Sequence, residues 1–377
     1  MKILEQIQGE PQNIKKAKNE RLFSLDTLRG FDMFWITGGG ELFAYIGKIT
    51  GAEWITLQMD HAEWIGFHLY DLIFPLFMFL SGVAIPYAIV SKLEKGLPRK
   101  PMVTKVFKRM VLLVLLGIIY NKGLQGDLAD IRFASVLGQI GVAYFIASMI
   151  IMYTSSLKSR VLWLLAILSA VAFLQLLVPV PGFGAGVLTP QGSINGFVDR
   201  LLLPGELFAG TYDPEGLLCI VSATGITLMG TFAGNILRVK QFTEWEKIGL
   251  MSTAGLVLII IAIAISPFYP IIKKCWTGSF VLLTGGISFL LMALFFMLID
   301  VLLWKRWSFY FRVIGMNSIF IFLFVRFVNI NILITNMLSW STTFHGEAIE
   351  LFSIIGKITF IWGLLYCMYK KEIFLKI

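Results

Sequence analysis

Residues 21–86 read RLFSLDTLRGFDMFWITGGGELFAYIGKITGAEWITLQMDHAEWIGFHLYDLIFPLFMFLSGVAIP and hold two apolar segments that are each long enough to cross a lipid bilayer. Ionisable side chains lie in or beside both segments, namely Asp26, Arg29, Asp32, Glu41, Asp60, His61, His68 and Asp71. Such groups are costly at membrane depth, so they are expected to face a polar interior and to mark a pathway or a site. We therefore expect this helical hairpin to carry the functional site.

The rest of the chain repeats the apolar pattern. Hydrophobic residues make up 57% of the 377 residues and the mean hydropathy is +0.79, which excludes an ordinary soluble domain. Windows of roughly 18 to 25 apolar residues predict an all-α, polytopic membrane protein with about ten transmembrane helices. The expected spans are 28–47, 65–91, 106–121, 135–154, 161–178, 215–236, 248–266, 277–301, 309–328 and 352–369.

The net charge of +9 is distributed as in a membrane protein, and we expect no nucleic-acid partner. With the N-terminus in the cytoplasm, 24 Lys and Arg residues fall in cytoplasmic segments. The outer segments hold only Lys48, Lys122, Arg132, Arg200, Lys273, Lys274 and Arg326. This excess fits the positive-inside rule and predicts that both termini are cytoplasmic. Residues 1–20 lack the apolar core of a signal peptide, so we expect a cytoplasmic lead followed by one transmembrane domain at 21–377.

Two loops are unusual. The basic loop at 91–109 either only sets the topology or also binds an anionic cytosolic ligand. The outer loop at 179–214 is longer than a simple connector, which favours a lid or binding loop, and its Pro and Gly content argues against a helix. Asp213 and Glu215 at its end are candidate substrate-binding residues. Their segment also has the composition of a cap for the helix that follows.

No familiar soluble-enzyme motif is present. The three cysteines lie far apart and do not have the spacing of a disulfide framework or a metal cluster, so no metal is expected. A nucleotide-binding loop, a zinc motif and a serine nucleophile elbow are all missing from the sequence. Asn317 is expected just inside the membrane from the cytosolic side, where its amide needs a partner on a neighbouring helix or on a ligand.

Several motifs along the chain together resemble one known family. They are SLDTLRG at 24–30, GGG at 38–40, HAEW and YDLIFPLFMFLSG within 61–82, VLGQIGVAYF at 136–145, YDPEGLL at 212–218 and GMNSI at 315–319. In this order they resemble the catalytic membrane domain of the heparan-alpha-glucosaminide N-acetyltransferase family and its bacterial relatives, within the wider transmembrane acyltransferases. The resemblance covers nearly the whole chain.

The resemblance implies a ten-helix domain that uses cytosolic acetyl-CoA to acetylate a terminal amino sugar across the membrane. It places the catalytic histidine at His61, which the charge pattern independently puts on the outer side. It also implies a homodimer. The large lumenal domain of the animal enzyme is missing from this sequence, which implies a bacterial member in the inner membrane.

Two motifs depart from the family pattern. Ile36 and Thr37 stand where members often have an asparagine and an aromatic residue, and Glu41 follows the triple glycine. Gly138 and Gln139 stand where a glutamine and an arginine are common. These differences leave the acceptor open, and Glu41 is a candidate substrate-binding residue.

Acetyl transfer to an amine needs a group that removes the amine proton and a group that stabilises a tetrahedral oxyanion. Histidine suits the first role, and the neighbouring Asp60 is a candidate to orient the ring of His61. Alternatively His61 itself carries the acetyl group. Asp71 is expected inside the second helix beside a bend at Pro75, where it either shapes the acetyl pocket or pairs with Arg29 or Lys357. His68 is a candidate substrate-binding residue or a polar partner.

The phosphates of CoA need cations at the cytosolic entrance, and its thin arm needs a narrow channel. Arg29, Arg109 and Asn317 are our candidates for the entrance, although an ion pair between Arg29 and Asp26 is the first expectation. Gly38, Gly39 and Gly40 are candidate cofactor-binding residues because they allow close approach of the arm or of a neighbouring helix.

Two other functions are compatible with the sequence. A sugar or ion transporter also carries intramembrane charges and interrupted helices, but no related pair of halves is evident here. O-acylation of a cell-envelope glycan would use the same machinery with a hydroxyl acceptor. A purely structural membrane protein would have little reason to bury so many ionisable groups.

Overall fold

The structure is a computed structural model that describes residues 22–121, 130–330 and 347–375, together with residues 332, 334 and 336. Over these residues it is built from helices, and its only β pairing is two isolated bridges, Arg132 with Gly205 and Val180 with Gly184. The predicted all-α class is confirmed. The lead expected at 1–20 lies outside the described residues.

The first half of the chain forms a helical hairpin followed by three longer helices. Its elements are α1 (Phe23–Phe34), η1 (Trp35–Gly39), α2 (Gly40–Thr50), α3 (Glu53–Gln58), η2 (Leu69–Leu72), α4 (Ile73–Ile85), η3 (Pro86–Val90), α5 (Ser91–Leu93), α6 (Arg99–Tyr120), α7 (Val136–Tyr153) and α8 (Leu157–Leu177).

The second half begins in the long outer loop. Its elements are α9 (Ile194–Leu202), α10 (Leu217–Arg238), α11 (Glu244–Ile265), η5 (Lys273–Cys275), α12 (Gly278–Phe296), η6 (Met297–Val301), α13 (Ser308–Gly315), α14 (Ser318–Phe327) and α16 (Glu347–Lys370).

All ten expected spans fall on helices, but the count of ten is not confirmed. Seven of the described helices are long and apolar enough to cross a membrane, or eight if α13 and α14 form one span bent by 72°. The hairpin of α1, η1 and α2 and the basic helix α6 are not among them. The chain is an integral membrane protein with seven or eight helices of spanning length and composition among the described residues.

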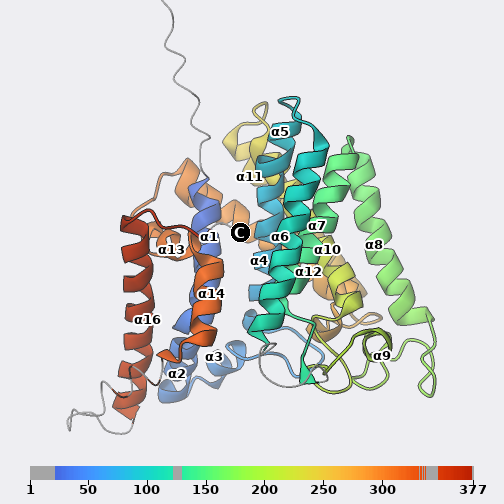
Figure 1. The fold of residues 1–377 in the computed structure, drawn as a ribbon, viewed down its shortest axis with the longest axis horizontal. Coiled ribbons are helices and arrows are strands. Elements are labelled where there is room, and N and C mark those ends of the chain that lie inside the picture. Colours follow the sequence, from blue (N-terminus) through green and yellow to red (C-terminus); the bar gives the residue numbers. More distant parts are fainter. Residues whose placement is uncertain are drawn as a thin grey trace, which may run out of the picture.

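Two apolar clusters hold the described bundle together. The larger joins α4, α7, α10 and α12, and includes Phe79, Met229 and Phe280, all of them almost fully buried. The smaller joins α1, α13, α14 and α16 around Met33, Ile321 and Leu365. Figure 1 shows the second group on the left and the first in the centre, with α8 at the right edge. The candidate site described below lies between these two groups.

Glycines let α4 and α10 lie in close contact. A Cβ atom at Gly82 would sit 2.0 Å from the carbonyl oxygen of Thr227, and one at Gly230 would sit 2.0 Å from that of Phe79. Gly230 and Gly234 are four residues apart, which is the spacing of the small-residue motif of membrane helix pairs. This close packing fixes α4, which carries much of the cavity wall, against the centre of the bundle.

Two local expectations were wrong. Pro75 does not bend a helix, because it lies in the first turn of α4, where the missing N–H costs nothing, and Asp71 precedes it in the 3₁₀ turn η2. The outer loop also contains a helix, α9, despite its Pro and Gly content. Ser193 caps α9 by accepting the backbone N–H of Gly196, which supplies the start signal that the loop composition concealed.

Candidate active site

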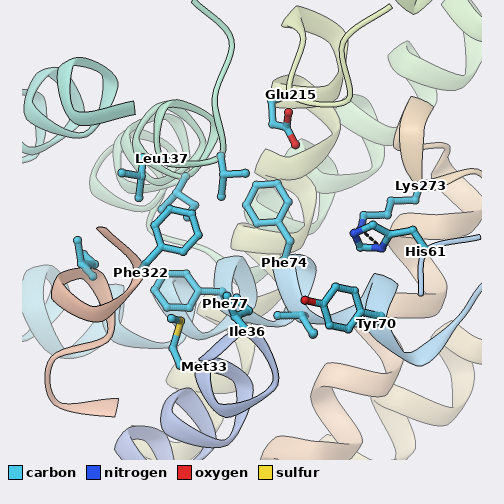
Figure 2. Close-up of a pocket in the computed structure, with 14 residues that line it drawn as sticks. Met33, Ile36, His61, Tyr70, Phe74, Phe77, Leu137, Glu215, Lys273 and Phe322 are labelled. Atoms are coloured by element: carbon cyan, nitrogen blue, oxygen red, sulfur yellow. Dashed lines mark hydrogen bonds between the residues drawn. The ribbon is translucent and has the colours of Figure 1, made fainter. Parts of the chain in front are cut away.

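A cavity of about 220 Å³ opens between the two helix groups. Its apolar wall comes from α1, η1, α4, α7 and α14 and includes Met33, Phe77 and Phe322. Polar groups gather at its other end, as Figure 2 shows for His61, Lys273, Tyr70 and Glu215. The cavity therefore combines a long apolar wall with a small charged end.

Asp71 organises the charged end. Its carboxylate is fully buried and its Oδ1 lies 2.8 Å from Nδ1 of His61. Its Oδ2 accepts the backbone N–H groups of Ala62, at 3.2 Å, and of His68, at 3.0 Å. One carboxylate thus holds both ends of the loop that carries His61.

This contact sets the tautomer of His61. A carboxylate only accepts hydrogen bonds, so the proton of the neutral imidazole must sit on Nδ1, and the lone pair is left on Nε2. The His61 side chain lines the cavity and is 46% exposed, so a molecule entering from outside can reach it. The arrangement has the geometry of a general base oriented by a buried carboxylate.

Lys273 is the second charged group of this end. Its Nζ lies 3.2 Å from Oδ1 of Asp71, and 2.9 Å and 3.3 Å from Nδ1 and Nε2 of His61. Burial lowers the pKa of Lys273 from its ordinary value, and the charge of Asp71 only partly opposes this shift. Lys273 was not among the predicted site residues, although its place among the few outer cations was a signal that it has a specific use.

Arg132 joins two acidic residues beside the cavity. Arg132 donates from Nε and Nη2 to the two oxygens of Asp213, at 2.7 Å and 2.6 Å, and from Nη2 to Glu215. Asp213 is fully buried, whereas Glu215 lines the cavity. Burial raises the pKa of Glu215 to about 7, with Arg132 opposing the shift. Arg132 was also missed, and it too is one of the outer cations.

The chain was compared with known protein families and with curated proteins. No protein-family model matches the chain. Heparan-alpha-glucosaminide N-acetyltransferase of Homo sapiens is 29% identical over 363 residues, which cover 80% of this chain and 52% of that protein. The Mus musculus protein of the same name is 26% identical over 433 residues, covering 98% of this chain and 62% of the relative.

The chain is a homologue of heparan-alpha-glucosaminide N-acetyltransferase. The resemblance seen in the motifs is thereby confirmed. The chain spans between half and two thirds of the length of these curated relatives.

The HAEW motif is anchored from two sides. Trp64 donates to the carbonyl oxygen of Leu188 in the outer loop at 2.6 Å, and its ring meets that of Tyr212 edge to face. Lys274 contacts the carbonyl oxygen of Glu63 and lies over the Trp64 ring. Segments that are more than 100 residues apart in sequence therefore fix the loop around His61.

Asp60 and His68 support the same loop, but in other ways than predicted. Asp60 does not orient the His61 ring, and His68 does not line the cavity. The Asp60 carboxylate accepts the backbone N–H of His61 at 2.7 Å, and the ring of His61 is oriented by Asp71 instead. Nδ1 of His68 lies 3.0 Å from the carbonyl oxygen of Asp60. Both residues hold the loop conformation in this structure.

The triple glycine lies where the first helix changes its winding. Gly38 lies in the π turn η1 and has a φ angle of 136°, which residues other than glycine rarely adopt. A Cβ at Gly39 would meet the ring of Phe34, and one at Gly40 would sit 2.9 Å from the ring of Tyr70. Tyr70 in turn contacts His61, with 5.0 Å between ring centroids. The glycines thus permit close helix and ring packing beside the cavity.

The other sequence-predicted residues lie outside the cavity lining. Arg29 is 3.7 Å from Asp26 on the same helix face, so the expected intrahelical pair is confirmed. The Arg109 guanidinium stacks on Tyr144, at 4.2 Å from the ring centroid, and its buried Nε has no hydrogen-bond partner in the described chain. The side-chain amide of Asn317 binds the C-terminal tail through the backbone of residues 373 and 375.

Glu41 lies in a separate cleft between α2, α3 and α16. Its carboxylate is 2.6 Å from Nζ of Lys357 in α16, and the same cleft contains the pair of Lys48 with Glu350. The structure therefore brings together His61, Asp71 and Glu215 from the predicted set, adds Lys273, and places Glu41 apart from them.

The cap of α10 differs from the expected one. Gly216 is its N-cap and no side chain of residues 213–216 caps it; Oδ1 of Asp199 in α9 accepts the Leu217 N–H at 2.9 Å. Asp213 instead accepts the N–H of Glu215. The cap comes from a neighbouring helix because Gly216 lets Asp199 approach closely, with its carboxylate only 2.0 Å from where a Cβ would be.

Asp199 gives a prediction about stability and pH. Burial raises its pKa to about 6, so between roughly pH 4 and 6 the folded protein binds more protons than the unfolded chain, and stability falls as pH rises through this window. Asp199→Asn keeps the cap oxygen without the charge. We expect the variant to be more stable than wild type by about 2–3 kcal/mol at pH 7 and equal to it near pH 4. Thermal unfolding in detergent across this range tests it, and an identical pH response in both proteins would contradict it.

Proposed function

We propose that this protein is a transmembrane acetyltransferase that moves an acetyl group from cytosolic acetyl-CoA to the amino group of a terminal glucosamine or related amino sugar on the outer side of the membrane. The observation that carries the proposal is the His61 imidazole, held by the buried Asp71 at the charged end of a cavity between the two helix groups. The names of the two homologues support the reaction class and the kind of acceptor.

His61 serves as the base in this proposal. Nε2 accepts a proton from the acceptor amine as its nitrogen attacks the thioester carbonyl carbon and the C–N bond forms. When the C–S bond breaks, His61 returns that proton to the departing CoA thiolate. The products are an N-acetyl sugar and free CoA, and the histidine ends in its starting state. In the alternative route Nε2 itself first takes the acetyl group.

The apolar wall of the cavity suits the slender arm of acetyl-CoA. Met33, Phe77 and Phe322 offer it contacts without competing polar groups. On the cytosolic side, Arg109 with its unpartnered Nε among the described residues is the best-placed candidate for a CoA phosphate. Arg29, Asn317 and the glycines at 38–40 remain candidates for the same path, as does the basic segment 91–109.

The acceptor is proposed to bind at the charged end. Amino sugars carry an amino group and several hydroxyls, and carboxylates bind both. The ammonium form of the amino group loses its extra proton to solvent before the neutral nitrogen attacks. Glu215 faces the cavity and Asp213 positions it through their shared partner Arg132. His68 and Glu41 are candidates for more distant parts of a glycan acceptor. The protein is proposed to act in a bacterial inner membrane, as a homodimer, without a metal.

The test is acetyl transfer by detergent-purified protein. Labelled acetyl-CoA and glucosamine are incubated with the protein, and N-acetylated product is measured by mass spectrometry. The proposal predicts product that depends on protein and on acetyl-CoA. A protein that binds acetyl-CoA but acetylates only a glycan hydroxyl would overturn the N-acetyl assignment. If the protein binds no acetyl-CoA, the proposal that it is an acetyltransferase is wrong.

The same preparation separates the two chemical routes. Incubation with labelled acetyl-CoA in the absence of acceptor is followed by rapid quenching at alkaline pH, which preserves acetyl-imidazole poorly, and at neutral pH. Label on a peptide containing His61 in the neutral sample indicates the acetyl-histidine route. If label leaves acetyl-CoA only when the acceptor is also present, the transfer is direct.

A further inference from the structure

Lys273 is a half-buried cation at the charged end of the cavity. Its side chain is 17% exposed, so much of it is withdrawn from water. Withdrawing an ammonium group from water is costly unless it is paired. Among the described residues the ion-pair partner of Lys273 is Asp71, which also serves His61 and two backbone N–H groups. An apolar residue at this position would avoid that cost, so the charge itself needs an explanation.

The loop that carries Lys273 is rigidly held. The Ile271 carbonyl oxygen accepts the Gly66 N–H at 2.9 Å, which joins this loop to the His61 loop. On the other side, the Cys275 carbonyl oxygen accepts the amide groups of Gln175 and Asn195, at 2.8 Å and 3.1 Å. Lys273 is therefore positioned by the fold before any ligand arrives, which is the condition for effective electrostatic stabilisation.

The ammonium group does not occupy the lone pair of the base. Nζ lies at similar distances from both ring nitrogens of His61. The in-plane directions of these two nitrogens diverge, so an atom near both is in line with neither. Lys273 therefore contacts the ring without lying in line with the lone pair of Nε2. Figure 2 shows the two side chains together among the residues that line the cavity.

We propose that Lys273 is a catalytic residue that stabilises the oxyanion formed during acetyl transfer; this inference rests on the proposed function. As the amine attacks, the electron pair of the C=O bond moves to oxygen while the amine proton moves to Nε2 of His61. The negative oxygen then lies within reach of the Lys273 ammonium. When the C–S bond breaks, the carbonyl re-forms, the thiolate takes the proton from His61, and Lys273 keeps its own proton throughout.

A carrier role for Lys273 does not fit the chemistry. An acetyl group on a lysine amine is an amide, which does not pass its acyl group to a second amine under ordinary conditions. Acetylation of Lys273 would also remove the charge next to Asp71. The positive charge, kept on the side chain, is therefore the useful property.

The test compares Lys273→Met with Lys273→Arg, and uses Lys240→Met, an exposed lysine away from the cavity, as the matched control. Loss of an oxyanion contact lowers kcat by about 10²–10³-fold. We expect this loss in Lys273→Met with acetyl-CoA binding retained, a partial loss in Lys273→Arg, and none in the control. Thermal unfolding of each variant excludes misfolding.

The pH profile provides a readout that a packing role would not change. The groups around Lys273 are Asp71, His61, Glu215 and Lys274. Wild-type kcat should fall at alkaline pH as Lys273 loses its proton, below the ordinary lysine range because burial lowers the pKa of Lys273. Lys273→Arg stays charged and should lose that alkaline decline.

Each outcome bears on a definite claim. An active wild type with full kcat in Lys273→Met overturns the role of Lys273 and leaves the acetyltransferase in place. An equal alkaline decline in wild type and Lys273→Arg also overturns it. A wild type that transfers no acetyl group overturns the proposed function first.

Discussion

His61→Ala is expected to lower kcat for acetyl transfer by roughly 10²–10⁴-fold, because a positioned general base contributes about this much. The His61 side chain is 46% exposed and lines the cavity, and its ring contacts Asp71, Lys273 and Tyr70. Acetyl-CoA should therefore still bind. Steady-state kinetics and a direct binding measurement on the same purified variant check both expectations.

His61→Gln is the matched variant. It keeps a polar side chain that can donate to Asp71 but cannot take up a proton in the relevant pH range. If the imidazole is needed as a base, Gln and Ala variants should be similarly inactive. Full activity in either variant would remove His61 from the mechanism.

Asp71→Asn is expected to have the second large effect, because it reverses the tautomer of His61. Two backbone N–H groups, from Ala62 and His68, point at one oxygen of this side chain and cannot turn into acceptors. The amide oxygen of asparagine must face them, so its NH₂ group faces Nδ1 of His61. Nδ1 then accepts, the proton moves to Nε2, and the base is lost. A reversed tautomer of this kind lowers kcat by about 10⁴-fold in the serine-protease triad.

Asp60→Asn provides the comparison for this variant. Its carboxylate contacts the backbone N–H of His61, and the oxygen of asparagine can accept the same bond. We expect a much smaller loss of kcat than for Asp71→Asn, with the two proteins unfolding at similar temperatures. Equal losses from both substitutions would mean that loop conformation, not the tautomer, is what matters.

The membrane class and the positions of the helices could be predicted because they depend on local composition. Long apolar runs with few charges have one stable arrangement in a bilayer, and the ten predicted segments are helical. The hairpin with His61 and Asp71 was also recognisable, since ionisable residues next to apolar spans are rare enough to indicate a site. The hydrogen bond between His61 and Asp71, which are ten residues apart, could not be predicted because it depends on how the loop between them folds.

Partners from distant segments could not be assigned from the sequence. Lys273 reaches His61 across more than 200 residues and Arg132 reaches Asp213 across more than 80. The useful signal was the exception to the positive-inside rule. Each outer cation in the described chain has a specific partner, as with Arg200 on the Thr211 carbonyl oxygen and Arg326 on that of Tyr120. A cation that topology does not require is best explained by its contacts.

The partners that cap α10 and bind the C-terminal tail also could not be predicted from the sequence. Asp199 caps a helix that begins 18 residues later, and Asn317 binds the backbone of the C-terminal tail. The Asn317 amide needed a partner, as the sequence indicated, and the Asp199 carboxylate also has one. The identity of the partner depends on how helices that are distant in sequence come together.

The central claim is that acetyl groups cross the membrane through this site, and sealed proteoliposomes test it most directly. Labelled acetyl-CoA is supplied outside and glucosamine is enclosed inside, with wild type and His61→Ala reconstituted in parallel. We predict labelled N-acetylglucosamine inside the vesicles for wild type and none for the variant. Product that forms only when acetyl-CoA and glucosamine share the same compartment would contradict the account.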